Sequence, residues 1–184
     1  YAGGKSVKET LTELIATVGE NMNLRRSKHL SVSNGFIATY VHNAIAPNLG
    51  KIGVMVALES NLPVEKLQQL GKQLAMHVAA ANPEYLDVAS VDAAAAEREK
   101  NIQRETAKAS GKPDDIIEKM LEGRMRKFYE EVCLMEQIFI MDGETRISAL
   151  LDKSSKEFGS PVKLTGYVRY VLGDGIEKEE TDFA

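Results

Sequence analysis

The sequence is poor in the residues on which protein chemistry most often depends. Its 184 residues include one cysteine, three histidines and no tryptophan. Cys133 has no partner for an internal disulfide and no second cysteine for a Cys-x-x-Cys motif, which favours a reducing, cytoplasmic compartment. No apolar run approaches the roughly 18 residues of a membrane-spanning helix. We therefore expect neither a disulfide framework nor a membrane partner.

An excess of positive charge is also lacking. The chain has 23 lysines and arginines against 27 aspartates and glutamates, a net charge of -4. Proteins that bind nucleic acid or anionic lipid through their overall field carry the opposite balance, so we expect no direct contact with nucleic acid. The 43% of hydrophobic and 27% of charged residues are typical of a folded globular domain.

The sequence contains no recognisable catalytic or metal-binding constellation. None of its histidines stands three or four residues from another histidine or cysteine, the spacing of metal ligands on a helix. It has no phosphate-binding loop of the G-x-x-x-x-G-K-[ST] type and no G-x-S-x-G elbow. The apolar neighbours of Cys133 favour a buried, inert thiol. We expect no enzyme, cofactor or metal, and a small enzyme using Cys133 or His42 stays the weaker alternative.

Hydrophobic periodicity predicts an α+β fold in which an antiparallel three-stranded sheet is backed by helices. The period of two predicts strands near 22–32, 36–43, 52–58 and 162–172. Asn34-Gly35 is the preferred dipeptide for a tight turn, so we expect it to close a hairpin, and we expect 46–50 to form a loop. The three-and-four spacing predicts helices near 7–18, 63–82 and 145–156.

Local signals refine two of these helices. Ser6 and Glu9 have the spacing of a capping box, and Gly19 is suited to end the first helix. Gly71 interrupts the apolar stripe of the second helix at a cost of about 1 kcal/mol, which predicts a close approach to the sheet as compensation. His77 lies on the flank of that stripe, and we expect it to be packed with a satisfied ring nitrogen.

Residues 91–131 differ in composition, with charged residues and alanine in two helical runs separated by residues 110–113. Their narrow apolar stripes predict an antiparallel helical hairpin that projects from the body. The residues expected between its helices are Ala95, Ile102, Ala109, Ile117, Met120, Leu121 and Phe128. Such an arm commonly meets a partner, and one alternative is that it serves self-association.

Tyr40 and His42 share one face of a predicted strand close to its end. Each combines apolar area with a polar group, so an exposed pair is a plausible contact anchor, the alternative being an ordinary edge pair. Arg25 and Arg26 could hold an acidic surface or a phosphate, but alternation along a strand predicts that only one of them can face a given partner.

Several stretches together resemble the bacterial translation elongation factor Ts family. They follow the family's order over nearly the whole chain. The stretches are residues 18–26, 40–42, 50–54, 75–80, 110–113, 122–125 and 173–178.

The resemblance implies a guanine nucleotide exchange factor that associates with elongation factor Tu and promotes exchange of GDP for GTP in protein synthesis. It also implies a homodimer through the helical hairpin and the core. Tyr40 and His42 match a motif that contacts the third domain of Tu. Val18 and Gly19 match a pair near its G domain, and Ile140 matches a further apolar contact position.

The resemblance also divides the chain. Residues 1–20 match a helix remaining from an upstream subdomain, and residues 21–90 and 132–172 match the α+β core. Residues 91–131 match the arm, and residues 173–184 match the start of a C-terminal module. The family's small helical domain and Thr-Asp-Phe-Val motif are not found here, and Thr181-Asp182-Phe183 matches the C-terminal module instead. The expectation is a piece that binds Tu but is impaired in exchange; the alternative is a self-association module without exchange activity.

Overall fold

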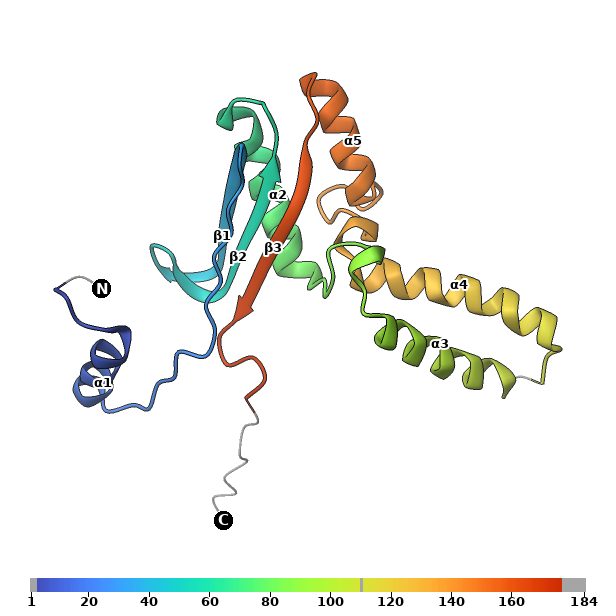
Figure 1. Cartoon of the computed structure of the whole chain (residues 1–184), viewed down its shortest axis with the longest axis horizontal. Coiled ribbons are helices and arrows are strands. Elements are labelled where there is room, and N and C mark those ends of the chain that lie inside the picture. The colour runs from blue at the N-terminus through green and yellow to red at the C-terminus, as the bar shows by residue number, and fades with distance from the viewer. Residues whose placement is uncertain (1–2, 110, 177–184) are drawn as a thin grey trace, which may run out of the picture.

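The computed structural model describes residues 3–109 and 111–176, and it has an α+β fold (Figure 1). Within these residues, a three-stranded sheet is accompanied by five α-helices and two short 3-10 turns. The helices are α1 (Val7–Val18), α2 (Val64–Ala81), α3 (Ala93–Lys108), α4 (Asp114–Val132) and α5 (Ile147–Phe158), the strands are β1 (Gly35–Ala46), β2 (Leu49–Glu59) and β3 (Lys163–Val171), and the 3-10 turns are Val88–Ser90 and Leu134–Glu136.

The sheet is antiparallel throughout, in the order β1-β2-β3, and α2 packs against one of its faces. The apolar stripe expected on this helix is buried there, with Leu67, Leu74 and Val78 fully enclosed. Burying a side chain of this size stabilises the fold by about 1.5–3 kcal/mol. The predicted helices near 63–82 and 145–156 and the strands near 52–58 and 162–172 are thus confirmed, within a few residues at their ends.

Gly71 explains how closely helix and sheet approach. A Cβ atom placed on Gly71 would lie 2.7 Å from the Cβ of Ala38 on β1. Real Cβ atoms do not come so near a neighbour, so no larger residue fits without a shift of the packing. The predicted close approach is confirmed.

The strand expected over residues 22–32 is wrong. The structure describes this stretch in full and assigns it no strand. It is followed by Ser33 and Asn34 and only then by β1, and the side chain of Leu30 lies beside Gly166 of β3. An extended chain laid over a sheet alternates its side chains in the same way as a paired strand does, so the period of two could not distinguish the two cases.

The hairpin turn was expected in the wrong place. Pro47 and Asn48 form the turn between β1 and β2, with φ of 61° at Asn48, so the expected loop over 46–50 shrinks to two residues. Gly35 instead opens β1 at φ of 146°, where a Cβ atom would lie 1.9 Å from the carbonyl oxygen of Leu58. The glycine is therefore required for close approach and not for a turn.

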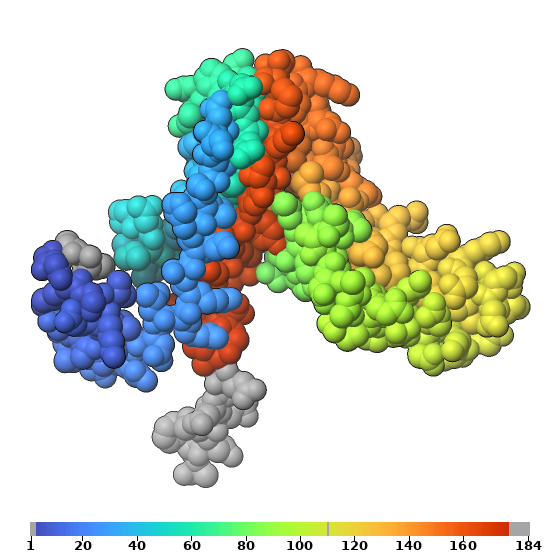
Figure 2. Space-filling model, viewed as in Figure 1, coloured from blue at the N-terminus to red at the C-terminus, as the bar shows by residue number. Residues whose placement is uncertain are grey.

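The helical hairpin of α3 and α4 is confirmed, and it projects from the body (Figures 1 and 2). Its own buried cluster consists of Ala107, Ile117 and Leu121, separate from the core around the sheet. The expected contacts of Ile102 and Ala109 are wrong. Ile102 is 59% exposed and Ala109 is also exposed. The residue of α3 that packs against α4 in this region is Ala107, which is fully buried.

Helix α1 has the predicted capping box: the N–H of Glu9 donates to the hydroxyl of Ser6, and the N–H of Ser6 donates to the Glu9 carboxylate. Gly19 ends it at φ of 79°. None of its residues, all within the described range, is buried, and Figure 1 shows it apart from the sheet. Residues 181–183, matched above to a C-terminal module, lie outside the described residues.

The two arginines after α1 do not diverge as expected. Arg25 donates to the carbonyl oxygen of Asp174, and Arg26 donates to the carboxylate of the same residue at 3.1 Å. The guanidinium of Arg26 also lies 4.8 Å from the ring centre of Tyr170. Because the stretch is not a paired strand, alternation does not constrain it, and both side chains reach the turn that follows β3.

Candidate protein-binding site

The end of the sheet near the β1–β2 turn contains a mainly apolar hollow, which we call the cup. It has a volume of about 240 Å³. Strand β1 supplies two residues, β2 one, α2 three, and the segment before α5 one. They are Tyr40, His42, Ile52, Met76, Ala79, Ala80 and Ile140. The cup thus joins residues 100 positions apart in sequence, since it includes both Tyr40 and Ile140.

Tyr40 and His42 form the polar side of the cup. Their side chains share one face of β1, as predicted, and His42 pairs across the sheet with Ile52. The hydroxyl of Tyr40 lies 3.0 Å from Nδ1 of His42, a hydrogen bond, with the ring centres 6.0 Å apart. Tyr40 packs against the core while His42 is exposed, so the pair presents an oriented imidazole beside apolar surface.

A chain of hydrogen bonds through the buried His77 holds Ile140 at the opposite wall. Its N–H donates to Nδ1 of His77 at 3.3 Å, and Nε2 of His77 lies 3.0 Å from the side-chain oxygen of Gln137. Nδ1 accepts a hydrogen bond, so Nε2 carries the proton of a neutral ring. The amide of Gln137 in turn donates to the carbonyl oxygen of Glu131 at 2.7 Å. The expectation of a packed, satisfied His77 is confirmed.

The surroundings of His77 keep it neutral. It is fully buried beside the ring of Phe139. Burial lowers the pKa of His77 from its ordinary value, with the hydrogen bond to Gln137 opposing the shift. A proton on Nδ1 would face the N–H of Ile140, donor against donor, so the neutral ring is the form that fixes the cup wall.

Val18 and Gly19, the other two residues matched by the resemblance, do not join the cup. They lie at the C-terminal end of α1, where Val18 is 53% exposed and Gly19 donates its N–H to the carbonyl oxygen of Ile15 at 2.8 Å. The structure therefore brings together three of the five matched residues: Tyr40, His42 and Ile140.

Sequence reasoning missed the floor of the cup. Met76, Ala79 and Ala80 come from α2. They lie on the side of the helix next to the apolar stripe that packs on the sheet. Their separations of three and four residues were the available signal, because such residues share a helix face. The helix was instead interpreted only from its stripe of larger apolar residues, which predicts the face that packs on the sheet.

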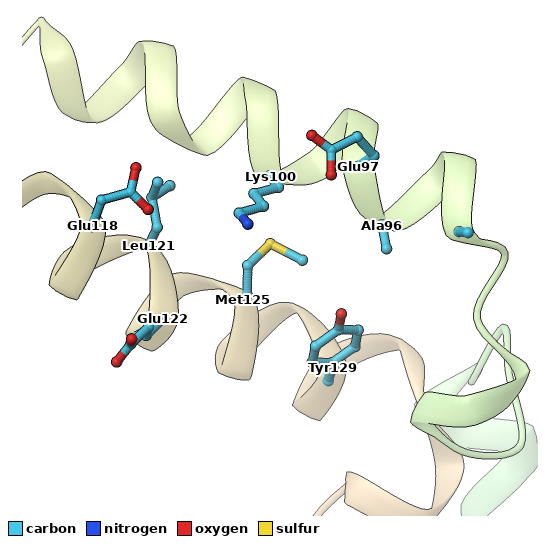
Figure 3. Close-up of a pocket in the computed structure, with 9 residues that line it drawn as sticks. Ala96, Glu97, Lys100, Glu118, Leu121, Glu122, Met125 and Tyr129 are labelled. Carbon is cyan, nitrogen blue, oxygen red and sulfur yellow. The ribbon is translucent and has the colours of Figure 1, made fainter.

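A second, larger hollow of about 500 Å³ lies between α3 and α4 (Figure 3). Met125 points into the space between the helices, while Glu97, Glu118 and Glu122 stand around it with one lysine, Lys100. Its lining is mixed, and it holds none of the matched residues.

Cys133, the thiol considered above, lines neither hollow. Cys133 is fully buried, and burial raises the pKa of its thiol to about 11, so it remains protonated and inert, as expected. Within the part of the chain that the structure describes, no three histidine, cysteine or acidic residues gather as metal ligands would. Over the same residues, no helix has the length and apolar character needed to cross a bilayer.

Fold and site together define an α+β domain with a projecting helical hairpin and an apolar cup beside an oriented histidine. The family model for elongation factor Ts matches residues 1–174. The chain belongs to the elongation factor Ts family.

Curated relatives named elongation factor Ts are similar over nearly the whole chain. Identity is 56% with the protein of Rhodospirillum centenum over 98% of this chain, 60% with that of Paramagnetospirillum magneticum over 98%, and 59% with that of Rhodospirillum rubrum over 100%. The matches cover 59%, 58% and 60% of those relatives, so the chain spans about three fifths of their length.

Proposed function

We propose that this chain is a binding module that associates with elongation factor Tu in the cytoplasm and takes part in the exchange of GDP for GTP on that protein. The observation that carries the proposal is the cup, which unites Tyr40, His42 and Ile140, three of the five residues that match the family's contact positions. Membership of the elongation factor Ts family supports the choice of partner.

The mechanism requires no reactive group. A factor that binds nucleotide-free Tu more tightly than the GDP form must weaken GDP binding by the same factor, because coupling between two ligands is reciprocal. Each 1.4 kcal/mol of coupling weakens the nucleotide about tenfold. The cup would contact the third domain of Tu, and the end of α1 at Val18 and Gly19 would lie toward its G domain, so that holding both favours one arrangement of Tu.

Calorimetry with nucleotide-free Tu and with Tu bound to GDP tests the proposal. We expect tighter binding to the empty form, and we expect His42→Ala to weaken it, because truncation removes the exposed imidazole from the rim of the cup. Equal affinity for the two forms would contradict the proposal. Release of a fluorescent GDP analogue in stopped flow measures exchange, and we expect it to be slow with this polypeptide, whose sequence lacks the Thr-Asp-Phe-Val motif.

A second candidate function is self-association through the arm. Ile102 and Ile116 are 59% and 42% exposed on α3 and α4. Apolar side chains exposed on a projecting hairpin are suited to pair with a second copy. A molar mass from light scattering that stays at the monomer value at high protein concentration would exclude this candidate.

A further inference from the structure

The chain between α1 and β1 crosses the surface of the molecule with little support of its own. Residues 20–33, which we call the linker, form no helix or strand, and most of their side chains are exposed. All of the linker belongs to the described part of the chain, and its only hydrogen bonds there run from Arg25 and Arg26. The position of α1 relative to the sheet therefore depends on these two side chains.

The two arginines close on a single acidic residue after β3. Arg25 donates to the backbone carbonyl oxygen of Asp174, and Arg26 donates to the carboxylate of Asp174 at 3.1 Å. The Arg26 guanidinium also lies 4.8 Å from the ring centre of Tyr170, within reach of a cation–π interaction. We call these four residues the clasp. An ion pair whose side chains are 46% and 57% exposed contributes little alone, but three contacts made by adjacent side chains hold the same point of the linker.

The clasp joins the linker to a part of the chain that is itself fixed. Backbone hydrogen bonds from Asp174 to Val171 and from Ile176 to Gly173, both 3.2 Å long, close turns directly after β3. A carbonyl group held in such a turn has a set direction, so Asp174 presents its acceptor to Arg25 in one orientation. The linker passes beside the end of β3 (Figures 1 and 2). The clasp thus fastens the linker to the sheet.

The clasp also shortens the part of the linker that can move freely. Arg25 stands six residues after Gly19, where α1 ends. The next contact with the sheet, where the side chain of Leu30 lies beside Gly166, stands eleven residues after Gly19. A flexible chain of n residues spans about 5–6 Å × √n, so the free span is about 13 Å with the clasp and about 18 Å without it. The effective concentration of α1 at a partner bound to the sheet falls as about the −3/2 power of the number of residues, which is about 2.5-fold.

We propose that the clasp is a positioning device, which holds α1 at one place beside the sheet so that the end of α1 and the cup contact the same partner molecule together. The inference rests on the proposed function, in which Val18 and Gly19 approach the G domain of Tu and the cup approaches its third domain. Two contacts on one body reinforce each other only when the chain between them holds both in reach. Arg25, Arg26 and Asp174 then influence the affinity for Tu through the position of α1.

Distances between spin labels test the device without Tu. Labels at Lys8→Cys on α1 and Lys66→Cys on α2 report the separation of α1 from the body, and both lysines are exposed. Cys133 is fully buried and does not compete for the label. We expect one narrow distance distribution in the otherwise unsubstituted chain, and a broader one in the clasp variant, which combines Arg25→Gln with Arg26→Gln.

The matched control combines Arg98→Gln with Arg126→Gln. It removes the same charge from two exposed arginines of the arm, whose side chains make no ion pair or hydrogen bond within the described residues. Its distance distribution should stay narrow. An equally narrow distribution in the clasp variant would overturn the inference, whatever the binding to Tu.

Calorimetry with nucleotide-free Tu tests the consequence for binding. We expect the dissociation constant to rise about 2.5-fold or more in the clasp variant and to stay unchanged in the control. Val18→Asp should abolish the difference between clasp variant and control, because the position of α1 matters only while α1 binds, whereas His42→Ala should leave the difference in place. A difference that persists with Val18→Asp would contradict the inference, since the clasp would then act elsewhere than through α1.

The same titrations separate the inference from the proposed function. If the unsubstituted chain binds Tu and the clasp variant binds equally well, the inference fails while the proposed function stands. If the unsubstituted chain does not bind Tu, the proposed function fails and the inference falls with it.

Discussion

At the scale of single residues, His77 links the stability of the fold to pH. Its buried neutral ring has a lowered pKa, so the unfolded chain takes up a proton at a higher pH than the folded chain does. Its contribution to stability is complete above the ordinary pKa of 6.5 and is lost as the pH falls toward the lowered value. Hydrogen bonds from Ser6 lower the pKa of Glu9, and a hydrogen bond with Thr145 lowers the pKa of Asp142. These two carboxyl groups therefore change the stability only at more acidic pH than His77 does.

We therefore expect the free energy of unfolding to decrease between about pH 7.5 and about pH 5.5. Urea titrations at the two values measure the change. His77→Gln removes the titrating ring and keeps a polar side chain, so its stability should depend less on pH over this range, whatever its absolute value. An equal slope in both proteins would show that His77 is not the group responsible.

Gly71 gives a prediction about packing. Gly71→Ala gains about 1 kcal/mol of helix propensity but places a methyl group 2.7 Å from the Cβ of Ala38, and such overpacking costs about 1–3 kcal/mol. We expect a net loss of about 1 kcal/mol, or about 2–4 °C in unfolding temperature. Calorimetric or circular dichroism melting measures it.

Gly123 on α4 provides the matched control, since a Cβ atom there would meet nothing within 4 Å. Gly123→Ala should raise the stability of the arm by about 0.5–1 kcal/mol. If both substitutions stabilise, the close approach of α2 to the sheet is not limiting.

Residue patterns predicted only part of the site. Tyr40 and His42 were predictable because a strand places alternate residues on one face, and the structure adds the hydrogen bond between them. Ile140 was reached only through the family resemblance, since its place in the cup depends on the hydrogen bond to His77, which joins residues 63 positions apart. No local pattern encodes a contact of that kind.

At the scale of elements, the helices were easier to predict than the segment that precedes β1. Caps and three-and-four spacing are local, and α1, α2 and α5 follow them closely. The apolar and polar residues before β1 alternate as in a strand. Pairing, however, depends on which edge of the sheet is free, and the sequence of this stretch alone does not determine that. For the same reason Asn34-Gly35 was misinterpreted, because its geometry serves close approach to β2.

Helix α1 tests how far capping alone stabilises an element. Ser6→Ala removes the side-chain acceptor of the capping box, which costs about 1 kcal/mol of helix stability. Because α1 buries none of its described residues, we expect the global unfolding temperature to stay the same while its amide hydrogens exchange faster. Hydrogen exchange resolved by residue measures both α1 and the sheet, and a lower global stability would show that α1 packs on the body in solution.

At the scale of the whole molecule, the described residues form two separate buried hydrophobic clusters. The cluster in the arm, at Ala107, Ile117 and Leu121, shares no residue with the cluster between the sheet and α2. The cup belongs entirely to the second region, and the exposed Ile102 and Ile116 belong to the first. The two candidate functions, binding of Tu and self-association, therefore reside on parts that can be separated.

Shortening the arm should separate them. Replacing residues 101–121 by a short glycine loop removes the exposed Ile102 and Ile116 together with the buried cluster of the arm, but keeps the base of both helices, including Glu130, which pairs with Arg146 at 2.9 Å. We expect the sheet to unfold at an unchanged temperature and Tu to bind with unchanged affinity in calorimetry, because the cup is intact. If the complete chain forms dimers in light scattering, the shortened one should be a monomer. Loss of Tu binding on shortening would instead place part of the Tu contact on the arm, since nothing at the cup would have changed.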